Sequence, residues 1–143
     1  PTHWSQTVLL DCGLKDGVSP GTALVGTRGL AGQIVEVKGS WSKALLITDA
    51  DSKVGAILER SRESGLLTGS PHGLLTLEYL SSDADLREGD RVLTAGFGES
   101  FPKGILIGEV IGFGRREETL LMYALIKPAE SLTQLEEVLC VSK

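Results

Sequence analysis

A chain of 143 residues that is 41% hydrophobic and 23% charged is long enough for one ordinary domain or two very small ones, and it is too apolar for a disordered tail. Its net charge of −5, with no Lys/Arg cluster longer than the pair Arg115 and Arg116, excludes the basic surface that nucleic-acid binding needs. No apolar run approaches the ~18 residues of a membrane span and no signal peptide is present, but the start at Pro1 without an initiator Met leads us to expect part of a longer protein.

The predicted elements are short strands separated by turns. In chain order, apolar or alternating runs predict strands at residues 7–11, 22–25, 30–37, 42–48, 54–58, 65–68, 74–80, 91–94, 105–113, 120–126 and 138–141. The run at 74–80 alternates, with Tyr79 on its apolar side. Residues 129–136 are the best helix candidate, because Ser131 and Gln134 fit a capping box, and a single turn near 82–86 is a weaker one. Strands that recur about every eight to twelve residues are typical of small barrels or a sandwich.

An internal echo indicates two related units. The motif Leu-Lys-Asp-Gly at 14–17 matches Leu-Arg-Glu-Gly at 86–89, and a long strand with an internal glycine, Gly32 or Gly108, follows each copy. A glycine inside a strand lets the strand kink, as a tightly coiled barrel requires. The alternative is a coincidence between two short glycine turns, which are common.

We therefore expect an all-β fold of two small, closely packed β-barrels with one short helix near the C-terminus. Because residues 74–80 close a run of six strands, residues 22–81 are assigned to one barrel, inserted into another barrel made of residues 1–21 and 82–143. A simple tandem arrangement is the alternative. Pairing of residues 7–11 with first-half strands would contradict the inserted version.

The sequence offers little for catalysis or ligand binding. His3 lies in the N-terminal segment and His72 in a turn, and neither has the orienting partner that a hydrolase base needs. Two Asp-Ala-Asp motifs, at 49–51 and 83–85, lack the other ligands and the glycine of a calcium loop. The glycine loop at 96–100 does not open a helix, which excludes a dinucleotide fingerprint. We expect no catalytic, cofactor-binding or metal-binding residues.

Two further features leave alternatives open. Cys12 and Cys140 would lie close together if the first and last strands pair, which would allow a disulfide; two free thiols are the alternative, because a disulfide needs specific geometry. Trp41, in a turn, is either an exposed interface residue or partly buried over a strand end.

Several glycine-rich stretches occur in the order typical of one known family. They are Trp4 with 7–18, 29–37 with 42–49, 83–90, Leu-Thr-Ala-Gly-Phe-Gly at 93–98 with Phe-Pro-Lys-Gly at 101–104 and Ile-Gly-Glu-Val at 107–110, and parts of 127–139. Together they resemble the extracytoplasmic β domain of the bacterial rod-shape-determining protein MreC, over nearly the whole chain. The turn and kink residues of this pattern are Gly17, Gly32, Gly89, Gly96, Gly98, Phe101, Pro102, Gly104 and Gly108. Cys12, Gly55 and Ala95 depart from the family's usual residues.

The resemblance implies two small β-barrels on the periplasmic side of the cytoplasmic membrane, preceded in a membrane-anchored full-length protein by a transmembrane helix and a coiled coil outside this chain. It implies a non-enzymatic scaffold of the cell-elongation machinery that organises peptidoglycan synthesis. The implied partners are MreB, MreD, a RodA-type glycosyltransferase and the elongation penicillin-binding transpeptidase, with self-association as dimers or filaments. A glycan-binding module and a two-barrel hydrolase are the alternatives; the former needs a row of exposed aromatics, and 5% aromatic residues are few for that.

Overall fold

The computed structural model describes residues 6–96, 101–132 and 138–141, with the side chains of 138–141 excepted. The elements are β1 (Thr7–Leu10), the 3-10 turn η1 (Leu14–Asp16), β2 (Ala23–Gly26), β3 (Leu30–Val37), β4 (Ser42–Leu46), β5 (Lys53–Leu58), β6 (Ser64–Gly69), the 3-10 turn η2 (Pro71–Gly73), β7 (Leu75–Leu80), β8 (Arg91–Thr94), β9 (Leu106–Arg115), β10 (Met122–Pro128) and β11 (Val138–Val141). The predicted all-β class is confirmed, since helix in the described residues is limited to η1 and η2.

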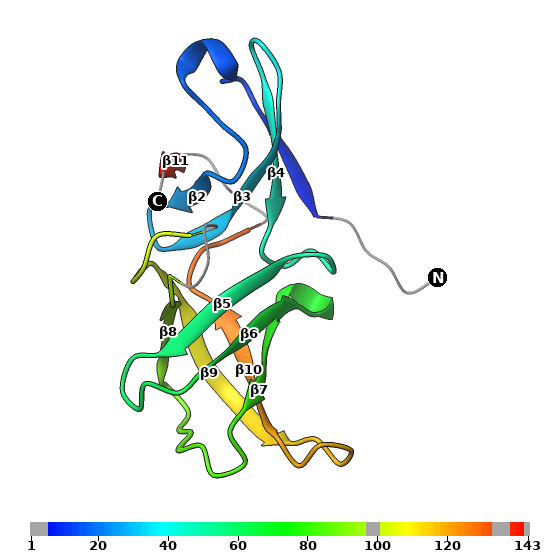
Figure 1. The fold of residues 1–143 in the computed structure, drawn as a ribbon, viewed down its shortest axis with the longest axis vertical. Helices are drawn as coiled ribbons and strands as arrows, with labels where there is room; N and C mark the ends of the chain where they lie inside the picture. The colour runs from blue at the N-terminus through cyan, green and yellow to red at the C-terminus, as the bar shows by residue number, and fades with distance from the viewer. Residues whose placement is uncertain (1–5, 97–100, 133–137, 142–143) are drawn as a thin grey trace.

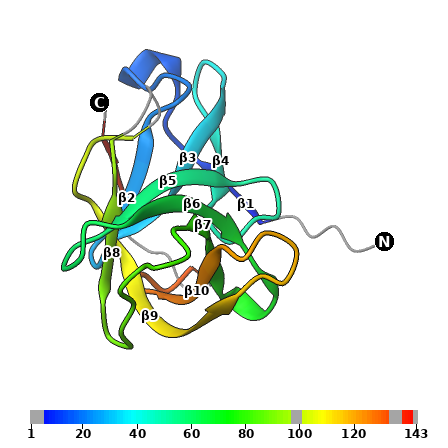
Figure 2. The same cartoon turned by 60° about the horizontal axis from the view of Figure 1, so that its bottom comes forward.

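The strands form two bodies. Five make a sheet in the order β1-β4-β3-β2-β11, and six make a closed barrel in the order β10-β7-β6-β5-β8-β9. The sheet lies at one end of an elongated molecule and the barrel at the other (Figure 1); Figure 2 brings the barrel end forward. Leu58, Leu77 and Ile126 are fully buried in the barrel, and Ala23 and Leu30 of the sheet belong to the same apolar cluster. The barrel cluster therefore extends into the sheet, which also has an apolar cluster of its own, made of Val18, Leu24, Ala31, Ile34 and Ala44.

The predicted division of the chain is wrong. β1 pairs antiparallel with β4, a first-half strand, and β11 returns from the C-terminal region to pair with β2. The observed bounds are 7–46 with 138–141 for the sheet and 53–128 for the barrel, in place of 22–81 for one barrel and 1–21 with 82–143 for the other. The tandem alternative fails too, because first-half strands β5, β6 and β7 enter the barrel. Alternation indicates which residues are extended, whereas the packing of the core selects the partner of each strand.

Two details of the predicted fold are not confirmed. The second of the two expected barrels is not closed. β6 joins β5 to β7 and closes the barrel, whereas the described part of the chain has no sixth strand that would close the sheet. The expected helix at 129–136 is not seen in its first four residues, which form bends and a turn; its remaining residues lie outside the described ranges.

The two bodies repeat one three-strand unit. The Gly21 N–H donates to the Ile34 carbonyl at 2.8 Å, and the Gly89 N–H donates to the Val110 carbonyl at 2.8 Å. A register shift between β2 and β3 recurs between β8 and β9. The unit β2-β3-β4 therefore corresponds to β8-β9-β10. Its hydrogen bonds align the Pro-Gly-Thr turn at 20–22, not the predicted motif at 14–17, with the turn at 88–90.

The strand that follows each copy of this unit in sequence pairs with the other copy. β5 follows β4 in sequence but pairs with β8, and β11 follows β10 but pairs with β2. The spacing from Leu46 to Ala56 equals that from Pro128 to Val138, so the exchanged strands occupy equivalent places. This exchange links the two bodies and explains why no cut in chain order separates them.

Gly32 and Gly108 are equivalent positions of the repeated unit, inside β3 and β9. Gly32 lies opposite Leu24 and Gly108 opposite Val92, each next to a register shift. A Cβ at Gly32 would lie 2.3 Å from the Leu45 carbonyl oxygen, and a Cβ at Gly108 would lie 2.1 Å from that of Lys127. Both contacts are with backbone, so neither strand tolerates a side chain without moving its neighbour.

Candidate interaction surface

The acidic residues considered for ligand binding have structural partners. The buried Asp49 carboxylate accepts the backbone N–H of Gln6 at 2.5 Å and that of Asp51 at 2.8 Å. Asp83 accepts a hydrogen bond from the Ser81 hydroxyl, which lowers the pKa of Asp83. The Asp49 carboxylate therefore caps a turn, as Asp side chains commonly do, and Asp83 is held by Ser81.

The structure describes one of the two histidines. His72 is exposed in η2, and His3 lies outside the described residues. Within the described ranges, no three His, Cys, Asp or Glu side chains form a group able to hold a metal ion. No helix among those residues is long and apolar enough to cross a membrane.

Thr94 organises the glycine loop between β8 and β9. Its buried hydroxyl donates to the Pro102 carbonyl at 2.6 Å and accepts from the Ile105 N–H at 2.8 Å. Phe101 anchors the loop in the core, while Gly98 lies outside the described residues. The other motif glycines in turns have positive φ angles; they are Gly17 (83°), Gly89 (91°), Gly96 (74°) and Gly104 (86°).

The condition for a disulfide between Cys12 and Cys140 is not met. β1 and β11 are the two outer strands of the sheet and do not pair with each other. Cys12 is a free, half-buried cysteine that packs against the apolar cluster of the sheet, and the Cys140 side chain is outside the described part. Trp41, in the turn between β3 and β4, is exposed (38%).

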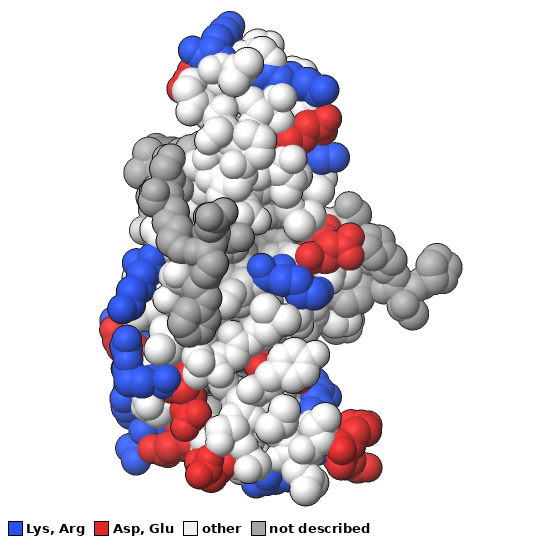
Figure 3. Space-filling model, in the orientation of Figure 1, with Lys and Arg blue, Asp and Glu red and all other residues white. Residues whose placement is uncertain are grey.

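An open groove lies where β6 and β7 meet the hairpin of β9 and β10; we call it the hairpin groove. Its lining includes Lys53, Leu66, Glu78, Tyr79 and Arg116. Acidic and basic side chains are interspersed on the face of the molecule seen in Figure 3, with no broad field of one sign. The groove combines apolar and aromatic surface with charges of both signs, and it contains Tyr and Arg, which are enriched at protein–protein contacts.

Two large apolar side chains are exposed at the hairpin groove and the hairpin tip. Tyr79 is 64% exposed and Leu120 is 59% exposed. Both have positive φ angles, 65° and 63°, which residues with a Cβ rarely adopt. Each such residue costs about 1 kcal/mol or more, and here no burial offsets the cost. Strained, exposed apolar residues of this kind favour a role in binding.

Arg116 holds the hairpin against β7. Its guanidinium lies 4.0 Å from the centre of the Tyr123 ring, and its Nε donates to Glu78 at 3.1 Å. The hydrogen bonds with Glu78 raise the pKa of Arg116, which stays charged. The exposed residues are therefore carried on a fixed framework, which limits the ordering that binding would require.

A second charged cluster joins the turn after β5 to the loop before β8. Arg60 donates from Nε to Asp90 at 2.7 Å, from Nη2 to the same carboxylate at 2.8 Å, and from Nη1 to Asp85 at 2.7 Å. These hydrogen bonds lower the pKa of both Asp90 and Asp85. Asp90 is buried and also accepts the Arg87 N–H at 3.0 Å. The cluster therefore stabilises the contact between the turn after β5 and the loop before β8.

The residues of the hairpin groove were not singled out from the sequence. Alternation placed Tyr79 with Leu75 and Leu77 on the buried side of its strand, and both leucines are fully buried. The register between β7 and β10 shifts at this point, which turns Tyr79 outward. No local sequence signal reports such a shift.

Comparison with known proteins gives a consistent result. The family model "Rod shape-determining protein MreC, barrel core" matches residues 1–142. The cell shape-determining protein MreC of Cereibacter sphaeroides is 38% identical over 105 residues, covering 73% of this chain and 35% of that protein. The MreC of Listeria monocytogenes is 32% identical over 143 residues, covering 96% of this chain and 48% of that protein. The chain thus spans a third to a half of the length of these relatives.

Solved structures agree with this match. A Listeria MreC structure has a TM-score of 0.91 at 29% identity, covering 99% of this chain and 70% of that chain. The MreC of Pseudomonas aeruginosa has a TM-score of 0.90 at 27% identity, covering 99% of this chain and 92% of that chain. A complex of PBP2 with MreC from Helicobacter pylori contains a chain with the same fold, at a TM-score of 0.73 and 20% identity. The match covers 89% of this chain and 79% of that chain.

Proposed function

Because the chain belongs to the family of the rod shape-determining protein MreC, we propose that it is a non-enzymatic scaffold of the cell-elongation machinery that organises peptidoglycan synthesis outside the cytoplasmic membrane. The observation that carries this proposal is the match to the barrel core over residues 1–142. The relatives are cell shape-determining proteins, which fits a structural role. The hairpin groove supports a role in binding other proteins, because Tyr79 and Arg116 are of residue types enriched at protein interfaces.

We place this β module on the periplasmic side of the membrane. Two structures of the same fold, at 24% and 22% identity, are of a major periplasmic domain. The relatives are longer than this chain, and we propose that the full-length protein adds a membrane anchor and a coiled coil. Through that anchor it would reach MreB, MreD and a RodA-type glycosyltransferase, and the coiled coil would support self-association.

We assign the hairpin groove to the penicillin-binding partner. In the Helicobacter pylori complex, PBP2 is bound to MreC. Exposed Tyr and Arg side chains dominate binding at many protein interfaces, and Tyr79 and Arg116 both line this groove. The strain at Tyr79 and Leu120 is explained if a partner buries these side chains.

Replacing Tyr79 by Asn is expected to weaken binding of the elongation transpeptidase at least about tenfold, the equivalent of about 1.4 kcal/mol. Asn tolerates a positive φ, so the substitution removes the ring without adding strain. Isothermal titration calorimetry with the extracytoplasmic part of the transpeptidase measures the effect. Expression of the full-length variant in a rod-shaped cell lacking its own copy should give rounded cells.

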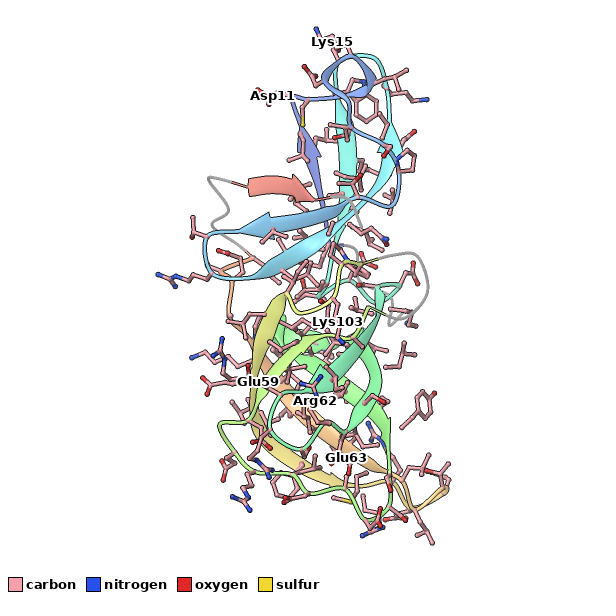
Figure 4. All side chains as sticks on the ribbon, turned by 60° about the vertical axis from the view of Figure 1, so that its left-hand side comes forward. Asp11, Lys15, Glu59, Arg62, Glu63 and Lys103 are labelled. Atoms are coloured by element: carbon pink, nitrogen blue, oxygen red, sulfur yellow. The ribbon has the colours of Figure 1, made fainter. Side chains whose placement is uncertain are left out.

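The matched control is Leu14→Ser, at the tip of the sheet. Leu14 is 70% exposed, comparable to Tyr79, but it lies in η1, next to Lys15 at the far end of the molecule (Figure 4). This variant should bind normally and support rod shape. Equal losses in both variants would reject the hairpin groove as the contact, and rods with Tyr79→Asn would reject its importance for cell shape.

A further inference from the structure

Tyr79 lies in a β-bulge of the barrel. Two residues of β7, Glu78 and Tyr79, lie opposite the single residue Tyr123 of β10. The extra residue of a bulge leaves the regular pairing, and bulges often point a side chain in a new direction. Leu77 and Leu80, on either side of the bulge, are 0% exposed, whereas Tyr79 is 64% exposed. The bulge therefore turns Tyr79 out of the barrel and towards the hairpin groove.

Arg116 contacts both sides of this bulge. Its guanidinium lies 4.0 Å from the centre of the ring of Tyr123, which is the residue opposite the bulge. Its Nε donates to Glu78 at 3.1 Å, and its Nη2 donates to the other oxygen of the same carboxylate. Glu78 immediately precedes Tyr79 in the sequence. This two-pronged and stacked contact requires arginine, because a lysine ammonium is a point charge.

The Tyr123 ring, on which Arg116 rests, has a fixed place. Tyr123 lies opposite Gly114 in the pairing of β10 with β9. A Cβ at Gly114 would lie 2.8 Å from the Tyr123 Oη, so the ring occupies the space that a side chain at position 114 would need. The ring therefore lies against the backbone of β9 and gives the Arg116 guanidinium a rigid support.

Leu120, the second exposed apolar residue with a positive φ, is held in a different way. Its N–H donates to the Arg116 carbonyl at 2.9 Å, and its carbonyl accepts from the Arg115 Nη1 at 2.8 Å. The Arg116 N–H donates to the Leu121 carbonyl at 2.8 Å. These bonds use the backbone of Arg116 and not its side chain. Leu120 is therefore an internal comparison for any change of the Arg116 side chain.

The hydrogen-bonding groups of the Arg116 side chain are largely used within the chain. Nε and Nη2 both donate to Glu78, and the guanidinium lies over Tyr123. The Glu78 side chain is only 21% exposed, so this contact is partly shielded from water and from a partner. A direct bond from Arg116 to a partner would compete with these contacts. Arg116 is therefore better placed to hold Tyr79 than to bind a partner itself.

We propose that Arg116 is a positioning residue that holds Tyr79 in its outward, positive-φ conformation before a partner binds. This inference rests on the assignment of the hairpin groove to the transpeptidase. Because a positive φ is unfavourable for tyrosine, Tyr79 leaves this conformation when the contact with Arg116 is lost. Only a fraction of the molecules then presents the ring, and the apparent affinity falls in proportion to that fraction.

The conformation of Tyr79 in the unbound chain is the first test. Arg116→Lys keeps the charge and removes the two-pronged, stacked contact. NMR coupling constants and chemical shifts should show a negative φ at Tyr79 in this variant, while φ at Leu120 stays positive. The matched control Arg115→Lys should leave φ at Tyr79 positive, because the Arg115 guanidinium donates to the Leu120 carbonyl. A positive φ at Tyr79 in folded Arg116→Lys would overturn the proposal.

Binding is the second test, measured as a double-mutant cycle by calorimetry with the extracytoplasmic part of the transpeptidase. Arg116→Lys should weaken binding about fivefold or more in the otherwise unsubstituted chain. In a chain that already carries Tyr79→Asn it should weaken binding by less than about twofold, because the ring that Arg116 holds is gone. Losses that multiply in the double variant would assign Arg116 to a direct contact and overturn the proposal.

A further variant and the pattern of outcomes complete the test. Glu78→Ala removes the other half of the contact and should reproduce both effects of Arg116→Lys, and circular dichroism checks that each variant is folded. If Tyr79→Asn binds as tightly as the unsubstituted chain, the groove is not the contact, and both the assignment and the proposal are overturned. If Tyr79→Asn binds weakly but φ at Tyr79 stays positive in Arg116→Lys, the assignment stands and only the proposal is overturned.

Discussion

Replacing Gly108 by Val is expected to lower the free energy of unfolding by about 3 kcal/mol or more, a large part of the 5–15 kcal/mol of a typical domain. The Cβ alone would lie 2.1 Å from the Lys127 carbonyl oxygen, less than any real contact. Relief requires β9 and β10 to separate at a place where β8 also shifts its register on β9. Urea unfolding followed by circular dichroism measures the loss.

A control for this prediction lies in the same strand. Gly112 is in β9, has no positive φ, and a Cβ there would meet no atom within 4 Å. Gly112→Ala should therefore change stability by no more than about 0.5 kcal/mol. Similar losses for the two glycines would show that glycine in β9 matters only through the flexibility of the chain, and not through close approach of the backbones.

The equivalent substitution in the sheet tests whether the molecule unfolds as one unit. Gly32→Val places its Cβ 2.3 Å from the Leu45 carbonyl oxygen, so a loss similar to that of Gly108→Val is expected. Because Ala23 and Leu30 of the sheet pack in the barrel cluster, a single transition should persist in both variants.

The sequence predicted most strands and that Gly32 and Gly108 lie inside two of them, but not how the strands pair. Strand residues are visible because alternation and turn residues are local signals. Pairing of β5 with β8 and of β11 with β2 is a long-range exchange, and nothing within either strand encodes its partner. The similar residues at 14–17 and 86–89 aligned the two units incorrectly. The equivalent hydrogen bonds of Gly21 and Gly89 show which turns correspond.

The candidate surface was invisible in the sequence for a related reason. Tyr79 continues the apolar alternation of Leu75 and Leu77, and only the shifted register with β10 turns it outward. Arg60 likewise stands in a turn with no sign that Asp85 and Asp90 lie beside it. Contacts between residues distant in the chain depend on which strands pair. A wrong pairing therefore also gives wrong contacts for the hairpin groove and for the Arg60 cluster.

Replacing Arg60 by Met is expected to lower the melting temperature by about 5 °C or more at pH 7. Arg60 forms a two-pronged contact with the buried Asp90, and its loss leaves that carboxylate with the Arg87 N–H in the described structure. An uncompensated buried charge is among the most destabilising changes. The matched control is Arg91→Met, because Arg91 lies 3.9 Å from Glu59 in an exposed ion pair and such pairs contribute little.

The effect of Arg60→Met should depend on pH with a definite sign. Arg60 lowers the pKa of Asp90 and Asp85 in the folded protein, so the folded state releases these protons more readily than the unfolded state. The resulting stability is fully present above the unfolded pKa of about 3.9 and is lost as the pH falls through the lower folded value. Urea midpoints should therefore differ most between the unsubstituted chain and Arg60→Met near neutral pH, and should converge as the pH falls through the lowered folded pKa of these carboxyls. The lowered pKa of Asp83 is set by Ser81 and is common to both proteins, so it cancels in the difference. A gap that stays constant down to acidic pH would mean that Arg60 stabilises the barrel by packing of its aliphatic stem, which Met retains in part, and not by its charge on Asp90.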